Sequence, residues 1–283
     1  ASQLMTGWTR GNALFLAHTK ELIEQNAAAL AGEMDGWKPI VEMNIQGAST
    51  YDAQQSGLCV VGSIQTMYTD RRLDKYSRNP FGLIIVDEAH RAAGATYRKV
   101  IDHFRNLNND LKVIGLTATP TRSDETSLGI VFDSVAMQMS ISQSIDDGWL
   151  TPLSQKAIVI DGVDFSDVRL KKNEFAERDF TDASLEKILA DEERLQGLRA
   201  PIMDASGKRS TLVFMPGVKS AHLMASIINR FQPDSAAAID GETPKEMRAR
   251  IVSDFRAGKL QYLCNCLVLT EGFDAPECSC LAM

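Results

Sequence analysis

Hydrophobic residues in the first half of the chain fall into short runs, and longer stretches between the runs place apolar residues at helical spacing. The short runs predict buried strands, and the longer stretches predict helices. Their alternation is typical of right-handed crossover units and of a mainly parallel sheet. We predict strands near residues 12–17, 57–63, 81–87 and 111–117, and helices near residues 19–32 and 95–106.

The second half of the chain repeats this alternation, so we expect the two halves to share one kind of fold. One helix start is indicated residue by residue. Thr243 can cap the helix, Pro244 suits its first position, and Glu246 can complete a capping box. We predict strands near residues 211–215, 236–240 and 261–269, and helices near residues 217–230 and 244–257.

Between the halves the chain becomes more polar. Residues 140–148 are expected to form a helix, followed by a strand-like stretch at 156–160. Residues 161–199 are nearly half charged, and an amphipathic helix near 183–204 should pack against the second domain. The chain thus predicts an α/β protein with a first domain at 1–150, a connector at 151–200 and a second domain at 201–283.

The apolar run at 81–86 ends abruptly in two carboxylates, Asp87 and Glu88, and His90 follows them. Open α/β sheets bind ligands at the carboxyl ends of their strands. One carboxylate there can hold Mg²⁺, which prefers oxygen ligands, and its neighbour can orient or deprotonate a water that attacks a phosphoryl group. The simpler alternative is that the two acids only favour the first turn of a helix.

A second motif follows further along the chain. Residues 111–116 predict another strand, and it ends in Thr117-Ala118-Thr119-Pro120. At this point the chain resembles the superfamily-two helicases of the DEAD/DEAH-box type. Their motif II is Asp-Glu-Ala-His and their motif III is Thr-Ala-Thr. Both motifs occur here in that order, on successive predicted strands.

Further stretches resemble other motifs of the same superfamily, so the resemblance covers essentially the whole chain. Among the branches, the chain is most similar to the RadD-like DNA-repair ATPases and to the translocase subunits of restriction enzymes, and phage helicases share the pattern. The matching stretches are residues 13–25 for motif Ia, 60–66 for Ic, 212–222 for IV, 239–248 for the next block, and 266–276 for V.

The resemblance implies two RecA-like domains with mainly parallel sheets. Motors of this kind use a Gly-x-x-x-x-Gly-Lys-Thr loop to hold the phosphates of ATP, and no such run occurs in the sequence. Motif VI, whose arginines reach the γ-phosphate, would follow beyond Met283. We therefore expect both domains to be incomplete at the chain ends and the chain alone to be inactive. A degenerate homologue is the alternative explanation.

The resemblance also implies roles in ATP hydrolysis, with ATP and Mg²⁺ as cofactors. Asp87 would hold Mg²⁺ and Glu88 would position the attacking water. His90 would bridge towards the second domain, unless its role is locally structural. The remaining residues would link nucleotide state to domain movement (Thr117 and Thr119, which can also be turn caps), approach the nucleotide closely (Gly272) and contact its ribose (Asp274).

Nucleic-acid contacts are expected where strands lead into helices, because backbone N–H groups point outward there. Such contacts read the backbone, so binding should tolerate any sequence and weaken with salt. The expected partner is DNA, and RNA remains an alternative. The residues that would track the strand are Ala17, His18, Thr19, Gln65 and Thr66 in the first domain, with Thr270 and Lys219 in the second.

Charge and cysteine content change this picture little. A net charge of −7 does not indicate a basic nucleic-acid surface, but the motifs outweigh it. The pattern formed by Cys264, Cys266, Cys278 and Cys280 lies in strand-like segments, which favours core packing over a zinc site.

Packing is also expected for Trp8, Trp37 and Trp149 rather than base stacking. No apolar run is long enough for a membrane span, so a cytoplasmic protein is expected.

Other functions remain to be weighed against the motor. The first is a nucleic-acid-binding fragment without ATP turnover. The second is a different Mg²⁺ enzyme, such as a nuclease or phosphatase, which would need more carboxylates at other strand ends than the sequence offers. A zinc peptidase is excluded because the chain has no His-Glu-x-x-His run.

Overall fold

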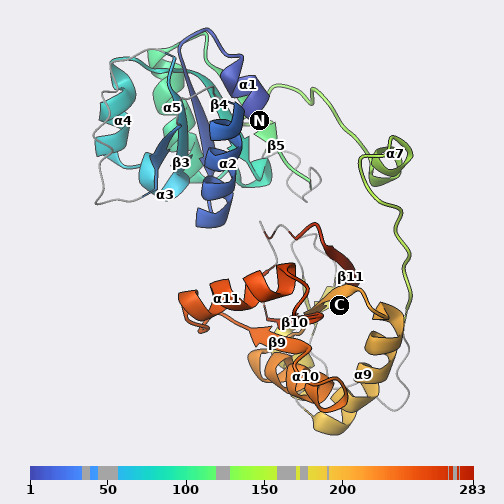
Figure 1. Ribbon diagram of the computed structural model, residues 1–283. Helices are drawn as coiled ribbons and strands as arrows, with labels where there is room; N and C mark the ends of the chain where they lie inside the picture. The colour runs from blue at the N-terminus through green and yellow to red at the C-terminus, as the bar shows by residue number, and fades with distance from the viewer. Residues whose placement is uncertain are drawn as a thin grey trace. The chain divides into compact units, whose positions relative to one another are not determined.

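The chain folds into two compact units, residues 1–150 and 151–283, and each is considered by itself. The structure is a computed structural model (Figure 1). It describes residues 1–33, 39–43, 57–118, 128–157, 170–172, 178–189, 191–266, 268–269, 273 and 275–283.

A five-stranded parallel sheet forms the centre of the first unit, as the alternation of strands and helices predicted. Its strand order is β2-β3-β1-β4-β5. The four longer strands fall where the apolar runs placed them, whereas the short β2 was not predicted. The strands are β1 (Asn12–Ala17), β2 (Ile40–Glu42), β3 (Cys59–Ser63), β4 (Phe81–Asp87) and β5 (Lys112–Leu116).

Helices cover both faces of this sheet (Figure 1). Strand side chains alternate between the faces, so one face buries Phe15 and Ile85 against α1 and α2, and the other buries Leu14 and Ile84 against α5. The helices before residue 110 are α1 (Ser2–Thr6), α2 (Lys20–Glu33), α3 (Ile64–Met67), α4 (Asp70–Ser77), the 3₁₀ turn η1 (Ala89–Arg91) and α5 (Ala95–Leu107). The later α7 (Ile141–Asp146) has no buried residue.

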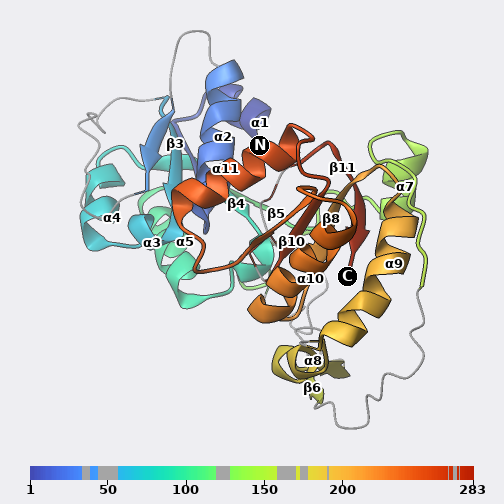
Figure 2. The same ribbon diagram turned by 60° about the horizontal axis from the view of Figure 1, so that its bottom comes forward.

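The second unit is built around a four-stranded parallel sheet in the order β11-β8-β10-β9. Helices α9 and α10 lie side by side on one face (Figure 2), and α11 packs on the other. The elements are β6 (Leu170–Lys172), β7 (Arg178–Phe180), α8 (Asp182–Leu189), α9 (Glu192–Ser206), β8 (Ser210–Phe214), α10 (Val218–Phe231), β9 (Ala236–Ile239), α11 (Lys245–Arg256), β10 (Tyr262–Asn265) and β11 (Cys278–Ala282).

Several predictions for the second half were wrong in detail. The single helix expected near 183–204 is two helices, α8 and α9. The capping box does not form, because the Thr243 hydroxyl is already bonded to the Asp240 carboxylate and amide, and Pro244 occupies the cap position itself. The strand expected at 261–269, β10, ends at Asn265.

The prediction that the four cysteines pack in the core is confirmed for two of them. Cys264 and Cys266 are buried in the core, and burial raises the pKa of the Cys264 thiol to about 12. Cys278 and Cys280 are half-buried on β11. Within the described ranges, no cluster of three or more histidine, cysteine or acidic side chains has metal-binding geometry.

The tryptophan prediction holds for one residue and fails for another. Trp8 packs against the face that carries α2, but Trp149 is 76% exposed. Trp37 and most of the strand expected at 156–160 lie outside the described residues. None of the described helices has the length and apolar character that a membrane span requires.

Candidate functional site

The sheet of the first unit has a topological switch point between its neighbouring strands β1 and β4. From β1 the chain continues through α2 towards β2 and β3, on one side of β1. From β4 it continues through α5 to β5, on the opposite side. Ligands of open α/β sheets bind in the crevice at the carboxyl ends of two such strands. The residues that emerge there are His18 and Thr19 after β1, and Asp87 and Glu88 at the end of β4.

Asp87 is the last residue of β4, one step beyond the paired residues Leu16 and Val86. Its carboxylate is half-buried and accepts a hydrogen bond of 3.2 Å from the Glu88 amide. Burial raises the pKa of Asp87, while the neighbouring His18 acts in the opposite direction. A carboxylate that is partly withdrawn from water and still accessible is a suitable oxygen donor for a divalent cation.

Glu88 has a left-handed backbone conformation, with φ 49° and ψ 53°. Residues other than glycine and asparagine rarely adopt this backbone conformation, and such backbone strain is concentrated at functional sites. Here the conformation ends the strand and begins the turn η1. The Glu88 side chain is 28% exposed, so its carboxylate can reach a water molecule at the edge of the sheet.

His90 links the turn after β4 to the residue that follows β5. Its Nδ1 lies 3.2 Å from the Thr117 hydroxyl and 3.2 Å from the Glu88 Oε2. The His90 side chain is only 8% exposed. The buried His90 imidazole is therefore a direct link between the Asp-Glu-Ala-His motif and Thr117 of the Thr-Ala-Thr motif. The same imidazole contacts the Glu88 carboxylate.

The residues predicted to hold nucleic acid also come together in part. Gln65 is exposed at the start of α3, and its Nε2 donates to the His18 carbonyl at 3.0 Å. Thr19 accepts a bond of 3.3 Å from the Leu22 amide and so caps α2. The turns after β1 and β3 are thus tied to each other beside the Asp87 carboxylate.

Two of the predicted residues have their side chains inside the protein. Ala17 is fully buried at the end of β1. Thr66 is 1% exposed, its amide donates to the Ser63 hydroxyl at 3.2 Å, and its own hydroxyl accepts from Ser63 at 2.8 Å. Lys219 is exposed at the start of α10. Thr119, Thr270, Gly272 and Asp274 lie outside the described residues.

Sequence reasoning missed Tyr97, which the structure places near the two carboxylates. Tyr97 is 5% exposed on α5, and its hydroxyl has no hydrogen-bond partner among the described residues. Burial raises the pKa of Tyr97 to about 12, and the negative charges of Asp87 and Glu88 add to this effect while Arg91 opposes it. In the sequence, Tyr97 is one of the apolar positions of a predicted helix, and nothing there indicates that it lies near Asp87 and Glu88.

Two protein families match separate parts of the chain. Residues 1–122 match the family described as type III restriction enzyme, res subunit, and residues 193–283 match the helicase conserved C-terminal domain. The first match contains the Asp87 and Glu88 pair and the second contains α10.

Curated relatives extend over nearly the whole chain. A putative ATP-dependent helicase, IRC3 of Saccharomyces cerevisiae, is 31% identical over 95% of the chain and 38% of its own length. A putative mitochondrial ATP-dependent helicase, irc3 of Schizosaccharomyces pombe, is also 31% identical, over 95% of the chain and 42% of its own length. A 51.5 kDa protein of a Lactococcus phage is 27% identical over 95% of the chain and 52% of its own length. The chain thus spans roughly half or less of each of these relatives.

Solved structures with the same fold include the DUF1998 helicase MrfA bound to DNA and AMPPNP, with a TM-score of 0.59 and 15% identity. This match covers 95% of the chain and 37% of MrfA. Saccharomyces cerevisiae Dbp5 bound to RNA and ADP BeF3 has a TM-score of 0.55 and 18% identity, covering 99% of the chain and 65% of Dbp5. At such identities the likeness shows the fold, which is that of RecA-like helicase domains. Together with the two family matches and the helicase relatives, it shows that the chain belongs to the superfamily-two helicases.

Proposed function

We propose that the protein is an ATP-dependent motor, a helicase or translocase, that couples ATP hydrolysis to movement along nucleic acid. The observation that carries this proposal is the switch point between β1 and β4. There Asp87 and Glu88 stand beside the His18–Gln65 link, and His90 connects them to Thr117. A single edge of one sheet thus combines the groups that hydrolysis needs with the turns proposed to hold a strand.

In the proposed chemistry each carboxylate has its own task. Asp87, half-buried and with a raised pKa, would hold Mg²⁺, which when bound supplies positive charge to the phosphates of ATP. Glu88, whose side chain is 28% exposed and whose backbone is left-handed, would orient the attacking water and accept its proton. Gly272 and Asp274 are proposed to contact the nucleotide from the second unit, as the resemblance implies.

Coupling between hydrolysis and movement is proposed to pass through His90. The Nδ1 atom carries at most one hydrogen, and it lies at the same distance from an acceptor on Glu88 and from the Thr117 hydroxyl. A change in the charge around Glu88 can therefore change the bond to Thr117. Thr119 is proposed to take part in the same response, and a bridge from His90 towards the second unit would extend it.

Nucleic acid is proposed to bind along the turns after β1 and β3, through Ala17, His18, Thr19, Gln65 and Thr66, and through Thr270 and Lys219 in the second unit. For Ala17 and Thr66 only backbone groups are available, because both side chains are buried. Such contacts are to the sugar–phosphate backbone, which DNA and RNA share, so binding tests should compare single-stranded DNA, duplex DNA and RNA.

The proposal is tested by Glu88→Gln in the whole protein. We expect ATP turnover to fall by about 100-fold or more, because the general base is lost, while ATP binding is kept. The matched control is Glu24→Gln, which changes an exposed glutamate on α2. Turnover measured by phosphate release at the wild-type rate in Glu88→Gln would remove Glu88 from the mechanism.

The absence of a phosphate-binding loop motif from the sequence leads to a second test, of ATP hydrolysis by the chain alone. None of the 283 residues forms a Gly-x-x-x-x-Gly-Lys-Ser/Thr run, so we expect the 283-residue chain by itself to hydrolyse ATP only at the background rate. The same phosphate-release assay with added single-stranded DNA checks this expectation. Robust DNA-stimulated hydrolysis by these residues alone would contradict it.

A further inference from the structure

The hydroxyl group of Tyr97 on α5 is a buried polar group without a hydrogen-bond partner. The Tyr97 side chain is 5% exposed, and its hydroxyl oxygen is shielded from solvent and bonded to no other group that the structure describes. Buried polar groups in folded proteins are almost always paired, because an unpaired one loses its bonds to water without compensation. An exception therefore calls for a reason, such as a part in catalysis.

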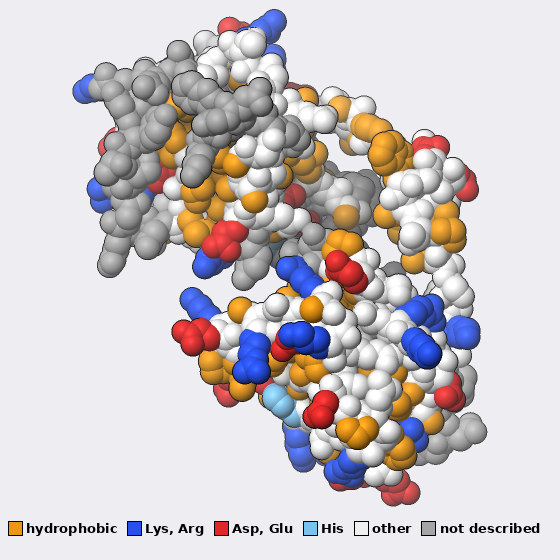
Figure 3. Space-filling view, viewed as in Figure 1, with side chains coloured by type: hydrophobic (Ala, Val, Ile, Leu, Met, Phe, Trp, Pro, Cys, Tyr) orange, Lys and Arg blue, Asp and Glu red, His pale blue; other side chains and the backbone are white. Residues whose placement is uncertain are grey.

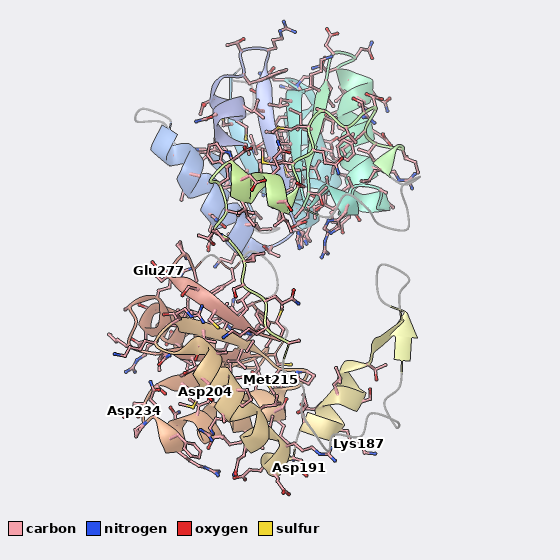
Figure 4. All side chains as sticks on the ribbon, turned by 90° about the vertical axis from the view of Figure 1, so that its right-hand side faces the viewer. Lys187, Asp191, Asp204, Met215, Asp234 and Glu277 are labelled. Atoms are coloured by element: carbon pink, nitrogen blue, oxygen red, sulfur yellow. The ribbon has the colours of Figure 1, made fainter. Side chains whose placement is uncertain are left out.

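The fold places this hydroxyl near the edge of the sheet that carries the two carboxylates. Strand β4 ends at Asp87, the turn η1 follows, and α5 begins at Ala95. Because α5 leads from the end of β4 back to the start of β5, its first turn lies at the carboxyl ends of the strands. Tyr97 lies in that turn, and its ring is part of the core on this face of the sheet. Figure 4 shows that side chains fill the space between the sheet and the helices of this unit.

The chemistry of the neighbouring groups selects Asp87 as the acceptor that suits this hydroxyl. A tyrosine keeps its hydrogen at neutral pH, and burial raises the pKa of Tyr97 further, to about 12. The guanidinium of Arg91 has only donors to offer. The Glu88 Oε2 already lies 3.2 Å from the His90 Nδ1. Asp87 accepts one bond from the Glu88 amide, and a carboxylate has about four acceptor positions, so it has room for a further donor.

We propose that Tyr97 is a positioning residue of the proposed ATP site, whose hydroxyl donates a hydrogen bond to the Asp87 carboxylate, directly or through one water molecule, when Mg²⁺ and ATP bind. This inference deepens the proposed function and rests on it. The bond fixes the orientation of the Asp87 carboxylate, and Tyr97 itself touches neither the metal nor the nucleotide. Hydrogen bonds of this kind to a carboxylate ligand strengthen the binding of its metal ion.

A tyrosine with a purely structural role predicts a different result when its hydroxyl is removed. A hydroxyl that stabilises the fold lowers stability when it is lost and leaves the Mg²⁺ requirement unchanged. A hydroxyl that pairs with Asp87 only in the loaded site has no bond to lose in the free chain. Its removal leaves stability unchanged or raises it, and increases the Mg²⁺ requirement. The two measurements together separate the roles.

The test is Tyr97→Phe, which removes only the hydroxyl. In the whole protein, we expect the Mg²⁺ concentration for half-maximal binding of a fluorescent, non-hydrolysable ATP analogue to rise about tenfold. The Mg²⁺ concentration for half-maximal phosphate release from ATP should rise by a similar factor. In the 283-residue chain without Mg²⁺, the midpoint of urea unfolding should equal or exceed that of the wild type, because no hydrogen bond is lost.

The matched control is Tyr76→Phe, which removes the same atom from a paired tyrosine. Tyr76 is fully buried in the same core, and its hydroxyl donates to the Glu42 Oε1 at 2.9 Å. We expect this variant to lower the midpoint of urea unfolding and to leave the Mg²⁺ requirement unchanged. The two variants should therefore show opposite patterns.

The other outcomes contradict the proposal. An unchanged Mg²⁺ requirement in Tyr97→Phe overturns it, and so does a fall in the urea midpoint as large as that of Tyr76→Phe. An equal rise of the Mg²⁺ requirement in Tyr76→Phe shows a general effect of core tyrosines instead. Failure of the proposed function is distinguishable, because the wild-type whole protein then shows neither Mg²⁺-dependent nucleotide binding nor phosphate release, and that result overturns both.

Discussion

At the scale of single residues, the end of β4 gives two adjacent acids different properties. Asp87 is half-buried with a raised pKa, whereas Glu88 has a left-handed backbone and contacts His90. The acids themselves were evident in the sequence. The left-handed conformation of Glu88 was not, and neither was the burial of Tyr97 near the two acids, because the sequence alone does not show how the turn after β4 and helix α5 come together.

The raised pKa of Asp87 leads to a prediction for stability. A carboxyl whose pKa is raised on folding stabilises the fold while protonated, and this contribution is lost as the pH rises through the raised pKa. We therefore expect Asp87→Asn to be more stable than the wild type at pH 7 without Mg²⁺, by less than about 1 kcal/mol because the group is partly solvated. Urea unfolding between pH 4 and pH 7 measures the difference, which should vanish towards the acid end. Asp110→Asn, at an exposed position, serves as the control.

The bond between His90 and Thr117 gives a second prediction. Thr117→Val keeps the shape of the side chain but removes the hydroxyl that lies 3.2 Å from the His90 Nδ1. We expect the whole protein to keep most of its basal ATP hydrolysis and to lose much of the stimulation by nucleic acid, about tenfold, since one charge-sensitive hydrogen bond is removed. The exposed Thr96→Val is the matched control. Full stimulation in Thr117→Val would show that this contact does not couple the two events.

At the scale of elements, strands were predicted better than the short helices. The runs at β1 and β4 are apolar because helices bury both of their faces, and this pattern is local in sequence. Helix α4 was missed because its buried residues include Arg72, which resembles a surface residue until its partner is known. That partner is Glu42 on β2, some thirty residues earlier.

The charged cluster between β2 and α4 supports a prediction of its own. Glu42 is fully buried, with Arg72 at 2.8 Å, Lys75 at 2.6 Å and the Tyr76 hydroxyl at 2.9 Å. Glu42→Gln should destabilise the chain by about 3 kcal/mol, because Arg72 is left as a buried cation without its counter-charge. Urea unfolding at pH 7 measures this loss.

A double variant tests the reason for that loss. Glu42→Leu combined with Arg72→Leu removes both buried charges, so it should recover much of the stability lost in Glu42→Gln. If the double variant is less stable than Glu42→Gln, the destabilisation comes from lost packing rather than from an uncompensated charge.

At the scale of the whole molecule, two separate cores are joined by an exposed stretch. Residues 133–157 contribute no buried side chain, and apolar groups there are in contact with solvent. Figure 3 shows such side chains in orange along the segment beside α7. The exposed members include Val135, Met137, Ile141, Trp149 and Leu153.

This arrangement predicts that each unit stays folded when the chain is cut between the two cores. Brief digestion with a non-specific protease should cut within residues 133–157, because exposed backbone with few contacts is cleaved first. Mass spectrometry should identify the fragments, and circular dichroism after their separation should show that each keeps its helices. Loss of structure in either fragment on cleavage there would show that its core depends on the other unit.

The left-handed backbone of Glu88 affects which amino acids are favoured at this position when a library of variants is selected. Residues with a Cβ atom are generally strained at this positive φ, whereas glycine adopts it without strain and asparagine adopts it more readily than most others. A library randomised at this one codon and sorted for thermal resistance alone should therefore enrich glycine and asparagine over glutamate. Sorting the same library for ATP turnover by the whole protein should bring glutamate back if Glu88 has the proposed role. The difference in thermal stability between the two selected residues would then measure the stability cost of that role.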